Sequence, residues 1–325
     1  MSRFIFVMFF VLPASFPMAL AAESTAVADH GHGIWTLRQD GADRFRFRFG
    51  TAEKPLIKPY FDVFATLEGR NILRDAPADH VHHHALMFAI KIDDVNFWEE
   101  YGDFGREVFV QNTLRTDAKE SVEGDVIRTA TAVECKLDWI GPDDKTLLHE
   151  NRKVIRNTAG DTDHVFLDWT STFTLPEGKP SAKLGGNHYH GLGMRFDRTM
   201  DDGGRFFSDR GDDQNETVRG TENLTECRWM AYTAKLHGKP VTVAIFDAPE
   251  NFRKMRAFTM GGRDKIFAYL SATTNLHREP VTMTAEKPVV FRYGIALWEG
   301  ERSTEEVEKV YELRMKSSAD RQKVE

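Results

Sequence analysis

The sequence has little of what would assign it to several common protein classes. Its 325 residues include only two cysteines, Cys135 and Cys227, which excludes a disulfide-dense fold and leaves open whether these two thiols pair. Beyond its first residues, no apolar run approaches the length of about 20 residues that a membrane-spanning helix needs. It also lacks a phosphate-binding loop, a dinucleotide fingerprint and a nucleophile-elbow serine in a supporting strand–helix context.

The chain also has fewer positively charged than negatively charged residues. The chain carries 43 Lys and Arg against 50 Asp and Glu, a formal net charge of −7. Because binding to phosphate backbones requires a basic surface, we expect no nucleic-acid partner. The hydrophobic fraction of 41%, with 24 Phe, is by contrast ample for a large packed core.

The first 21 residues are predicted to be a signal peptide. Arg3 precedes an apolar run from Phe4 to Leu12, and small residues then lead to an exit at Ala19–Ala21. This order is typical of secretory signals, and two prolines leave the run too short for a permanent anchor. We therefore expect cleavage after Ala21, no stable membrane insertion afterwards, and a periplasmic or secreted mature chain, residues 22–325.

Strand patterns dominate this mature chain. Phe and Arg alternate over residues 44–49, and the segment 165–173 places Val, Leu, Trp and Phe on one face, as half-buried strands do. Further strands are predicted at 241–246, 267–273 and 289–298, the last apolar on both faces as in a central strand. Short turn clusters separate these runs, which indicates a large antiparallel β-sandwich in a single domain.

One long helix is predicted, at residues 303–315. Ser303 and Glu306 have the spacing of a capping box, and Val307, Val310 and Tyr311 then recur at helical spacing. The predicted fold is therefore all-β with one C-terminal helix.

A histidine run is the strongest candidate for chemistry. Four of the twelve histidines lie in His80-Val81-His82-His83-His84. Imidazole suits both proton transfer near neutral pH and metal ligation. We predict His80, His82 and His83 as acid/base candidates, with Glu99 or Asp247 as the carboxylate partner. In an extended segment His80, His82 and His84 would share one side, which is the alternative set for a divalent metal.

A glycine-rich segment at residues 185–196 is the second candidate. It contains Asn187, His188, His190 and Arg195, and its glycines allow close approach of backbone to a ligand. A glycine-rich bend with exposed polar tips is the structural alternative. The expected substrate-binding residues are completed by Trp98, Lys58 and Tyr60.

The order of these segments resembles a known family. The chain has Lys58-Pro59-Tyr60-Phe61, Arg74-Asp75-Ala76-Pro77, the histidine run and Asn96-Phe97-Trp98, followed by the segment ending at Arg195, Val243–Asp247 and Phe291–Gly294. It is similar over residues 55–300 to the family labelled "methane oxygenase PmoA" or left as a domain of unknown function. Val81 and His84 replace residues that are usually Pro and Arg in that family.

The resemblance implies a fold and a setting rather than the activity in the label, since a methane oxygenase subunit is an integral membrane protein. It implies an exported sandwich like those of galactose mutarotases and polysaccharide lyases, from bacteria that degrade glycans. We therefore expect a carbohydrate-active enzyme, a hydrolase, lyase or epimerase, acting on a sugar or other small molecule without a predicted cofactor. The alternatives are a non-catalytic carbohydrate-binding protein and a metal-dependent oxidoreductase built on the histidine cluster.

Overall fold

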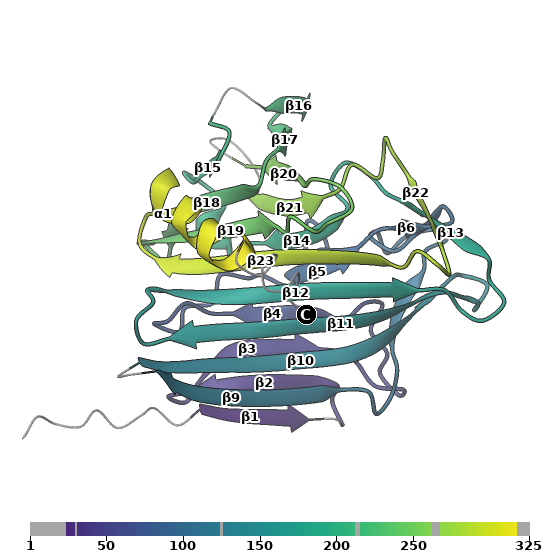
Figure 1. Cartoon of the computed structure of the whole chain (residues 1–325), viewed down its shortest axis with the longest axis horizontal. Coiled ribbons are helices and arrows are strands. Elements are labelled where there is room, and N and C mark those ends of the chain that lie inside the picture. Colours follow the sequence, from purple (N-terminus) through teal and green to yellow (C-terminus); the bar gives the residue numbers. More distant parts are fainter. Residues whose placement is uncertain (1–23, 30, 124–125, 212–214, 262–266, 317–325) are drawn as a thin grey trace, which may run out of the picture.

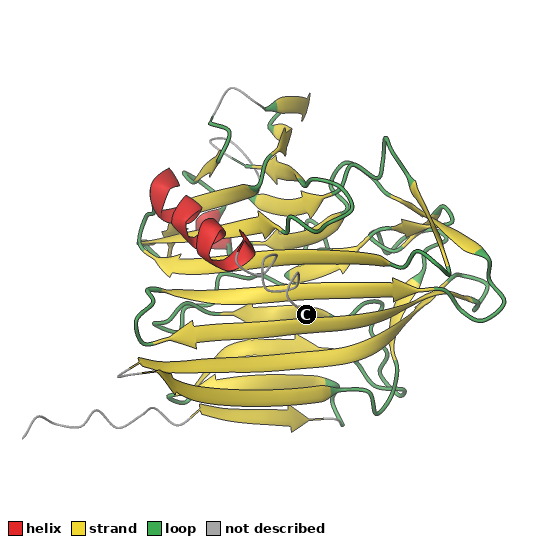
Figure 2. Cartoon of the chain, viewed as in Figure 1, coloured by secondary structure: helices red, strands yellow, loops and turns green. Residues whose placement is uncertain are grey.

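The computed structural model describes residues 24–29, 31–123, 126–211, 215–261 and 267–316. The predicted signal peptide, residues 1–21, lies outside the described residues. Within them the chain forms three antiparallel sheets, and the two large ones pack face to face (Figures 1 and 2). The predicted large antiparallel β-sandwich is confirmed.

The first large sheet has ten described strands. Its order is β1 (Ser24–Asp29), β2 (Ile34–Gln39), β3 (Ala42–Arg48), β4 (Tyr60–Phe64), β5 (Leu86–Ala89), β14 (Gly191–Arg195), β21 (Tyr269–Thr273), β20 (Arg256–Met260), β17 (Glu222–Glu226) and β16 (Glu216–Arg219). Strands from three distant parts of the sequence, β5, β14 and β21, are therefore neighbours.

The second large sheet has nine described strands, several of them long. Its order is β15 (Arg205–Ser208), β18 (Trp229–Leu236), β19 (Lys239–Asp247), β23 (Val289–Glu299), β12 (His164–Thr174), β11 (Thr146–Ala159), β10 (Val126–Ile140) and β8 (Arg106–Phe109), with β9 (Arg115–Glu123) also paired to β10. A small sheet of β22 (Val281–Thr284), β13 (Ser181–Gly185), β6 (Lys91–Ile92) and β7 (Val95–Asn96) lies beside them.

The main core lies between the two large sheets and is rich in aromatic rings. Phe45 and Phe47 of β3 are fully buried in it, whereas the side chains of Arg46 and Arg48 stay partly exposed and bind Asp62. This is the alternation that the sequence predicts. Burial of apolar surface on this scale supplies the main driving force for the fold.

The outer face of the second sheet carries its own apolar layer beneath helix α1 (Thr304–Tyr311) (Figure 1). Val307 and Val310 pack there against Trp229 of β18 and Trp298 of β23. β23 pairs with both β12 and β19 and is therefore a central strand. Its apolar residues are buried on both faces, as predicted, because one face packs into the main core and the other lies beneath α1.

The predicted capping box is present at α1. Ser303 accepts from the backbone N–H of Glu306, and the Glu306 carboxylate accepts from the backbone N–H of Ser303. The helix widens into a π-helical turn at Glu312–Lys316, so the predicted span of 303–315 is confirmed except for the form of its last turn.

The described residues contain neither a disulfide nor a membrane-spanning helix. Cys135 and Cys227 are both free and buried thiols, and burial raises the pKa of Cys135 to about 12. Among the described residues there is also no helix long and apolar enough to cross a bilayer.

Candidate functional site

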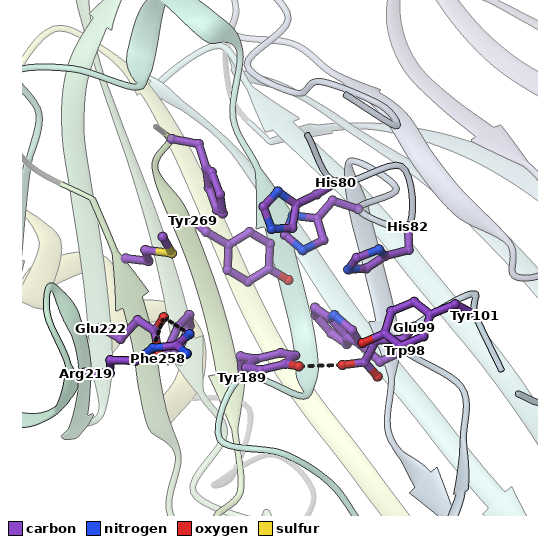
Figure 3. Close-up of a pocket in the computed structure, with 13 residues that line it drawn as sticks. His80, His82, Trp98, Glu99, Tyr101, Tyr189, Arg219, Glu222, Phe258 and Tyr269 are labelled. Atoms are coloured by element: carbon purple, nitrogen blue, oxygen red, sulfur yellow. Dashed lines mark hydrogen bonds and ion pairs between the residues drawn. The ribbon is translucent and has the colours of Figure 1, made fainter. Parts of the chain in front are cut away.

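One cavity brings the two predicted segments together. It has a volume of about 240 Å³ and is bordered by β21, β20, β17 and β16 of the ten-stranded sheet. Figure 3 shows the side chains that line it. Its lining is aromatic and titratable: His80, His82, His83, Trp98, Glu99, Tyr101, Tyr189, Arg219, Glu222, Phe258, Met260, Phe267 and Tyr269.

The histidine run enters the cavity on two successive tight turns. The backbone N–H of His80 donates to Pro77 (2.8 Å), and that of His83 donates to the carbonyl of His80 (3.0 Å). The rings of His80 and His83 consequently stack with their centroids 4.6 Å apart, and the ring of His82 lies edge-on, 4.8 Å from His83. Three imidazoles therefore reach the cavity from one short segment, residues 77–83, which we call the histidine turn.

His84 faces the opposite way, so the expected grouping of His80, His82 and His84 on one side is wrong. That grouping assumed an extended chain, whereas the turns rotate His83 toward the cavity and His84 away from it. Its ring nitrogens lie 2.8 Å from Asp75 and 3.0 Å from Glu100. Among the described residues no group of three or more His, Cys, Asp or Glu side chains is placed to hold a metal ion.

The structure places Lys58 and Tyr60, two of the predicted substrate-binding residues, behind this turn and outside the lining of the cavity. The ammonium of Lys58, fully buried, donates to Glu100 and to the carbonyl of Trp98, each at 2.8 Å. The hydroxyl of Tyr60 donates to Asp75 at 2.7 Å, and its ring stacks on His84. Burial alone would lower the pKa of His84, but its two carboxylate partners raise it.

Glu99 lies across the cavity from the histidine turn. Its carboxylate accepts from the Tyr189 hydroxyl and the Asn96 amide, and His190 lies 3.5 Å away (Figure 3). Burial would raise the pKa of Glu99, but contacts with His190, Tyr189 and Asn96 outweigh it and hold the pKa well below its usual range. Trp98 stacks on His190, with centroids 5.2 Å apart and planes 11° apart.

The glycine-rich segment contributes one lining residue and several supports. Tyr189 lines the cavity, whereas His190 is buried behind Trp98. At the rim, His188 contacts the lining residue Glu222 at 3.2 Å, and Asn187 accepts from the backbone N–H of His188. Of the predicted substrate-binding residues of this segment, His188, His190 and Asn187 thus lie outside the lining of the cavity.

Arg195 also stands behind the lining. Its guanidinium carbon lies 3.6 Å from the centroid of the Phe267 ring, and its Nη2 donates to Asp79 at 2.9 Å. It brings positive charge next to the cavity without lining it.

Asp247 does not join this site, which corrects its expected role as a carboxylate partner. It ends β19 of the other large sheet and borders a second cavity of about 330 Å³. Its carboxylate accepts from the Asn251 amide (2.8 Å) and the backbone N–H of Met255 (2.9 Å), and burial raises its pKa to about 6. It holds the segment that joins β19 to β20.

Two of the imidazoles that line the cavity, those of His82 and His83, differ in basicity. Burial lowers the pKa of His83 to about 2, so this ring is neutral at any physiological pH. Burial and the nearby Lys58 lower the pKa of His82 from 6.5 more mildly, because its ring is only half-buried. His82 therefore combines access to the cavity with a neutral ring at pH 7, as a general base requires.

Comparison with known protein families places this chain in a family whose activity is not known. A model for a family of unknown function (DUF6807) matches residues 35–312. The chain belongs to the DUF6807 family. Comparison with curated proteins finds no match. The DUF6807 match contains every lining residue of the cavity, from His80 to Tyr269.

Sequence reasoning missed several residues that line the cavity in this DUF6807 chain. They are Tyr101, Arg219, Glu222, Phe258, Met260, Phe267 and Tyr269. Phe267 and Tyr269 lie in the predicted strand segment 267–273, which gave a signal for a strand but none for a site. Glu222 and Arg219 form an ion pair of 2.7 Å at the rim and have no local motif at all.

Proposed function

We propose that this protein is a carbohydrate-active enzyme that moves a proton at a sugar carbon, as lyases and epimerases do. One observation carries the proposal: a half-exposed neutral imidazole, His82, faces the Glu99–Tyr189 pair in one aromatic cavity. A carbon acid needs a base and, on the other side of the reacting carbon, a donor or second base. Imidazole and phenol are suitable groups for both tasks.

The roles follow from the protonation states. His82 acts as the general base. Burial and the adjacent Glu99 raise the pKa of Tyr189, so its hydroxyl stays protonated and donates to Glu99, which it orients as the carboxylate partner of His82. Tyr101 and Phe258 supply faces on which a sugar ring can stack.

Hydrolysis is less well supported than elimination or epimerisation. Glycosidases commonly use two carboxyl groups, one of them protonated. Of the two carboxylates in the lining, Glu99 is held ionised, and Glu222 is paired with Arg219 and contacts His188. Glu99 is therefore not in the state of a general acid, and Glu222 is engaged by these two partners.

A carbohydrate-binding protein without catalysis is the second candidate, and the aromatic lining favours it. It differs from the enzyme in its pH behaviour. Binding through ring stacking would give an unchanged isotherm between pH 5 and pH 8, whereas turnover through His82 falls on the acid side.

We also propose that the protein works in the periplasm or outside the cell. The charged start, the short apolar run and the small-residue exit before Glu23 support this. Intact-mass measurement of protein secreted by a host bacterium tests it, and a full-length mass after export would refute cleavage at Ala21.

The catalytic proposal is tested by incubating the protein with glycosides, uronides and keto-glycosides and analysing the products by NMR. We expect turnover of at least one class and a loss of about 10²- to 10⁴-fold in His82→Ala, because a positioned general base contributes that much. His149→Ala is the matched control, since His149 is exposed on β11 of the other sheet. Absence of turnover, or full turnover by His82→Ala, would refute the proposal.

A further inference from the structure

One corner of the cavity is lined by buried polar atoms that form no hydrogen bond with any described residue. Among the described residues the indole Nε1 of Trp98, the hydroxyl of Tyr269 and Nδ1 of His83 make no hydrogen bond. All three side chains are more than nine-tenths buried, and all three line the cavity. Because buried polar groups in folded proteins are nearly always hydrogen-bonded, three together point to an occupant.

The three rings are neighbours. The ring centroid of Tyr269 lies 5.1 Å from that of His83 and 6.0 Å from that of Trp98, and the other two are 6.4 Å apart. Figure 3 shows the Tyr269 hydroxyl directed into the space beside His80 and Trp98. A single small group could therefore contact all three.

The polar atoms specify what that group must be. An indole N–H can only donate, and a phenol whose pKa is raised by burial remains a donor. The occupant must therefore accept hydrogen bonds. Arg195 adds charge of the matching sign. Its Nε and Nη1 are buried and have no hydrogen-bond partner within the described part of the chain, and Phe267, on which it stacks, is in the cavity wall.

We propose that the corner formed by Trp98, Tyr269 and His83 binds an sp² oxygen of the substrate, carried by the carbon next to the one that loses its proton. The oxygen belongs to the carbonyl of an oxidised sugar or to the carboxylate of a uronic acid. This inference rests on the proposed function, since it assigns the substrate class of the same cavity.

The step balances without an oxidant or a cofactor. His82 takes the proton, the C–H electron pair becomes a C=C bond, and the π pair of the C=O group moves onto the oxygen. The donors of the corner hold this enolate oxygen, so they bind the transition state more tightly than the ground state. Return of a proton to the other face gives an epimer, and departure of the β-substituent with its bonding pair gives an elimination product.

Close packing fixes the position of the Tyr269 hydroxyl. It lies over Gly193 of β14, where an added Cβ would come within 1.7 Å of it. The glycine predicted to allow a close approach thus makes room for this donor rather than for a ligand. The corner is formed before any substrate arrives.

The test compares Tyr269→Phe with Tyr293→Phe. Tyr293 is equally buried and its hydroxyl also has no partner among the described residues, but it lies on β23 outside the cavity. Calorimetric titration uses three probes: a methyl glucuronide, a methyl keto-glucoside and methyl glucoside, which has no sp² oxygen. We expect the wild-type protein to bind one of the first two at least about tenfold more tightly than methyl glucoside, since loss of one buried hydrogen bond has that size.

Tyr269→Phe should remove most of this preference for an sp² probe, and Tyr293→Phe should keep it. If the glucuronide is the preferred probe, the bound oxygen belongs to a carboxylate, and if the keto-glucoside is preferred, it belongs to a carbonyl. Equal affinity for all three probes, no binding of either sp² probe, or a preference unchanged in Tyr269→Phe would overturn the inference and leave the corner as a site for water only. The binding preference is measured separately from turnover. If the wild-type protein prefers an sp² probe and Tyr269→Phe loses that preference, but no substrate is turned over, only the catalytic proposal is refuted. Turnover that is insensitive to Tyr269→Phe refutes only the inference.

Discussion

At the scale of single residues, neighbouring histidines differ because their environments differ. His82 is half-buried, His83 is buried against Trp98 and Tyr269, and His84 lies between two carboxylates. Burial disfavours the charged ring, whereas a carboxylate partner favours it. One short run of imidazoles thus supplies a base, a fixed neutral ring and a ring whose charged form is favoured by its carboxylate partners.

These environments predict the order in which the histidines titrate. The pKa of His82 lies below 6.5 and that of His84 above 6.5. Activity that needs neutral His82 is therefore complete above its pKa and lost as pH falls through it. The ion pairs of His84 are complete at acid pH and lost as pH rises through its pKa. Side-chain NMR titration, with His82→Gln for assignment, checks this; His82 titrating above His84 would contradict the account.

The residue scale is also where sequence reasoning was weakest. It selected His80, His82, His83, Trp98 and Glu99, and all five line the cavity. It selected Lys58 and Tyr60 too, because a lysine and a tyrosine beside a histidine motif look like ligand contacts. Which way such side chains point depends on tertiary contacts with Glu100 and Asp75 that no local pattern encodes.

At the scale of elements, the histidine turn is held by a buried polar network. Tyr60, Asp75, His84, Glu100 and Lys58 form a continuous chain of contacts from β4 to the segment after β7. Networks of this kind rigidify a segment when every member is satisfied. The network therefore positions the turn and the Trp98–Glu99 segment relative to one another.

Removal of one member should be costly. Lys58→Met leaves the carboxylate of Glu100 buried without its ammonium partner, so we expect the free energy of unfolding to fall by about 3–5 kcal/mol. Lys136→Met, at an exposed position of β10, should change it by less than about 0.5 kcal/mol. Urea unfolding followed by tryptophan fluorescence measures both, and a loss below about 1 kcal/mol in Lys58→Met would refute the network.

Elements were predicted well wherever a local period or cap defines them. The alternation in β3, the two apolar faces of β23 and the capping box of α1 are all properties of consecutive residues. Glu222 escaped prediction because β17 reaches the cavity only through its pairing with β20, which pairs in turn with β21. Such non-local pairing leaves no local signal.

At the scale of the whole molecule, the topology creates the site. The ten-stranded sheet places β5, β14 and β21 side by side, and the segments that precede β5 and β14 carry the histidine turn and Tyr189. The second large sheet closes the core behind them and carries α1 on its outer face. The cavity thus rests on a rigid scaffold, which preorganised acid/base chemistry requires.

The most direct test of the account measures transfer of the proton itself. The protein is incubated in D₂O with a methyl glucuronide and a methyl keto-glucoside, and NMR follows loss of the C–H signal next to the carboxylate or carbonyl group. The account predicts exchange at least about 100-fold above buffer. It further predicts near-background exchange in His82→Ala and wild-type exchange in His149→Ala. Background exchange by the wild-type protein on both sugars, or undiminished exchange by His82→Ala, would contradict it.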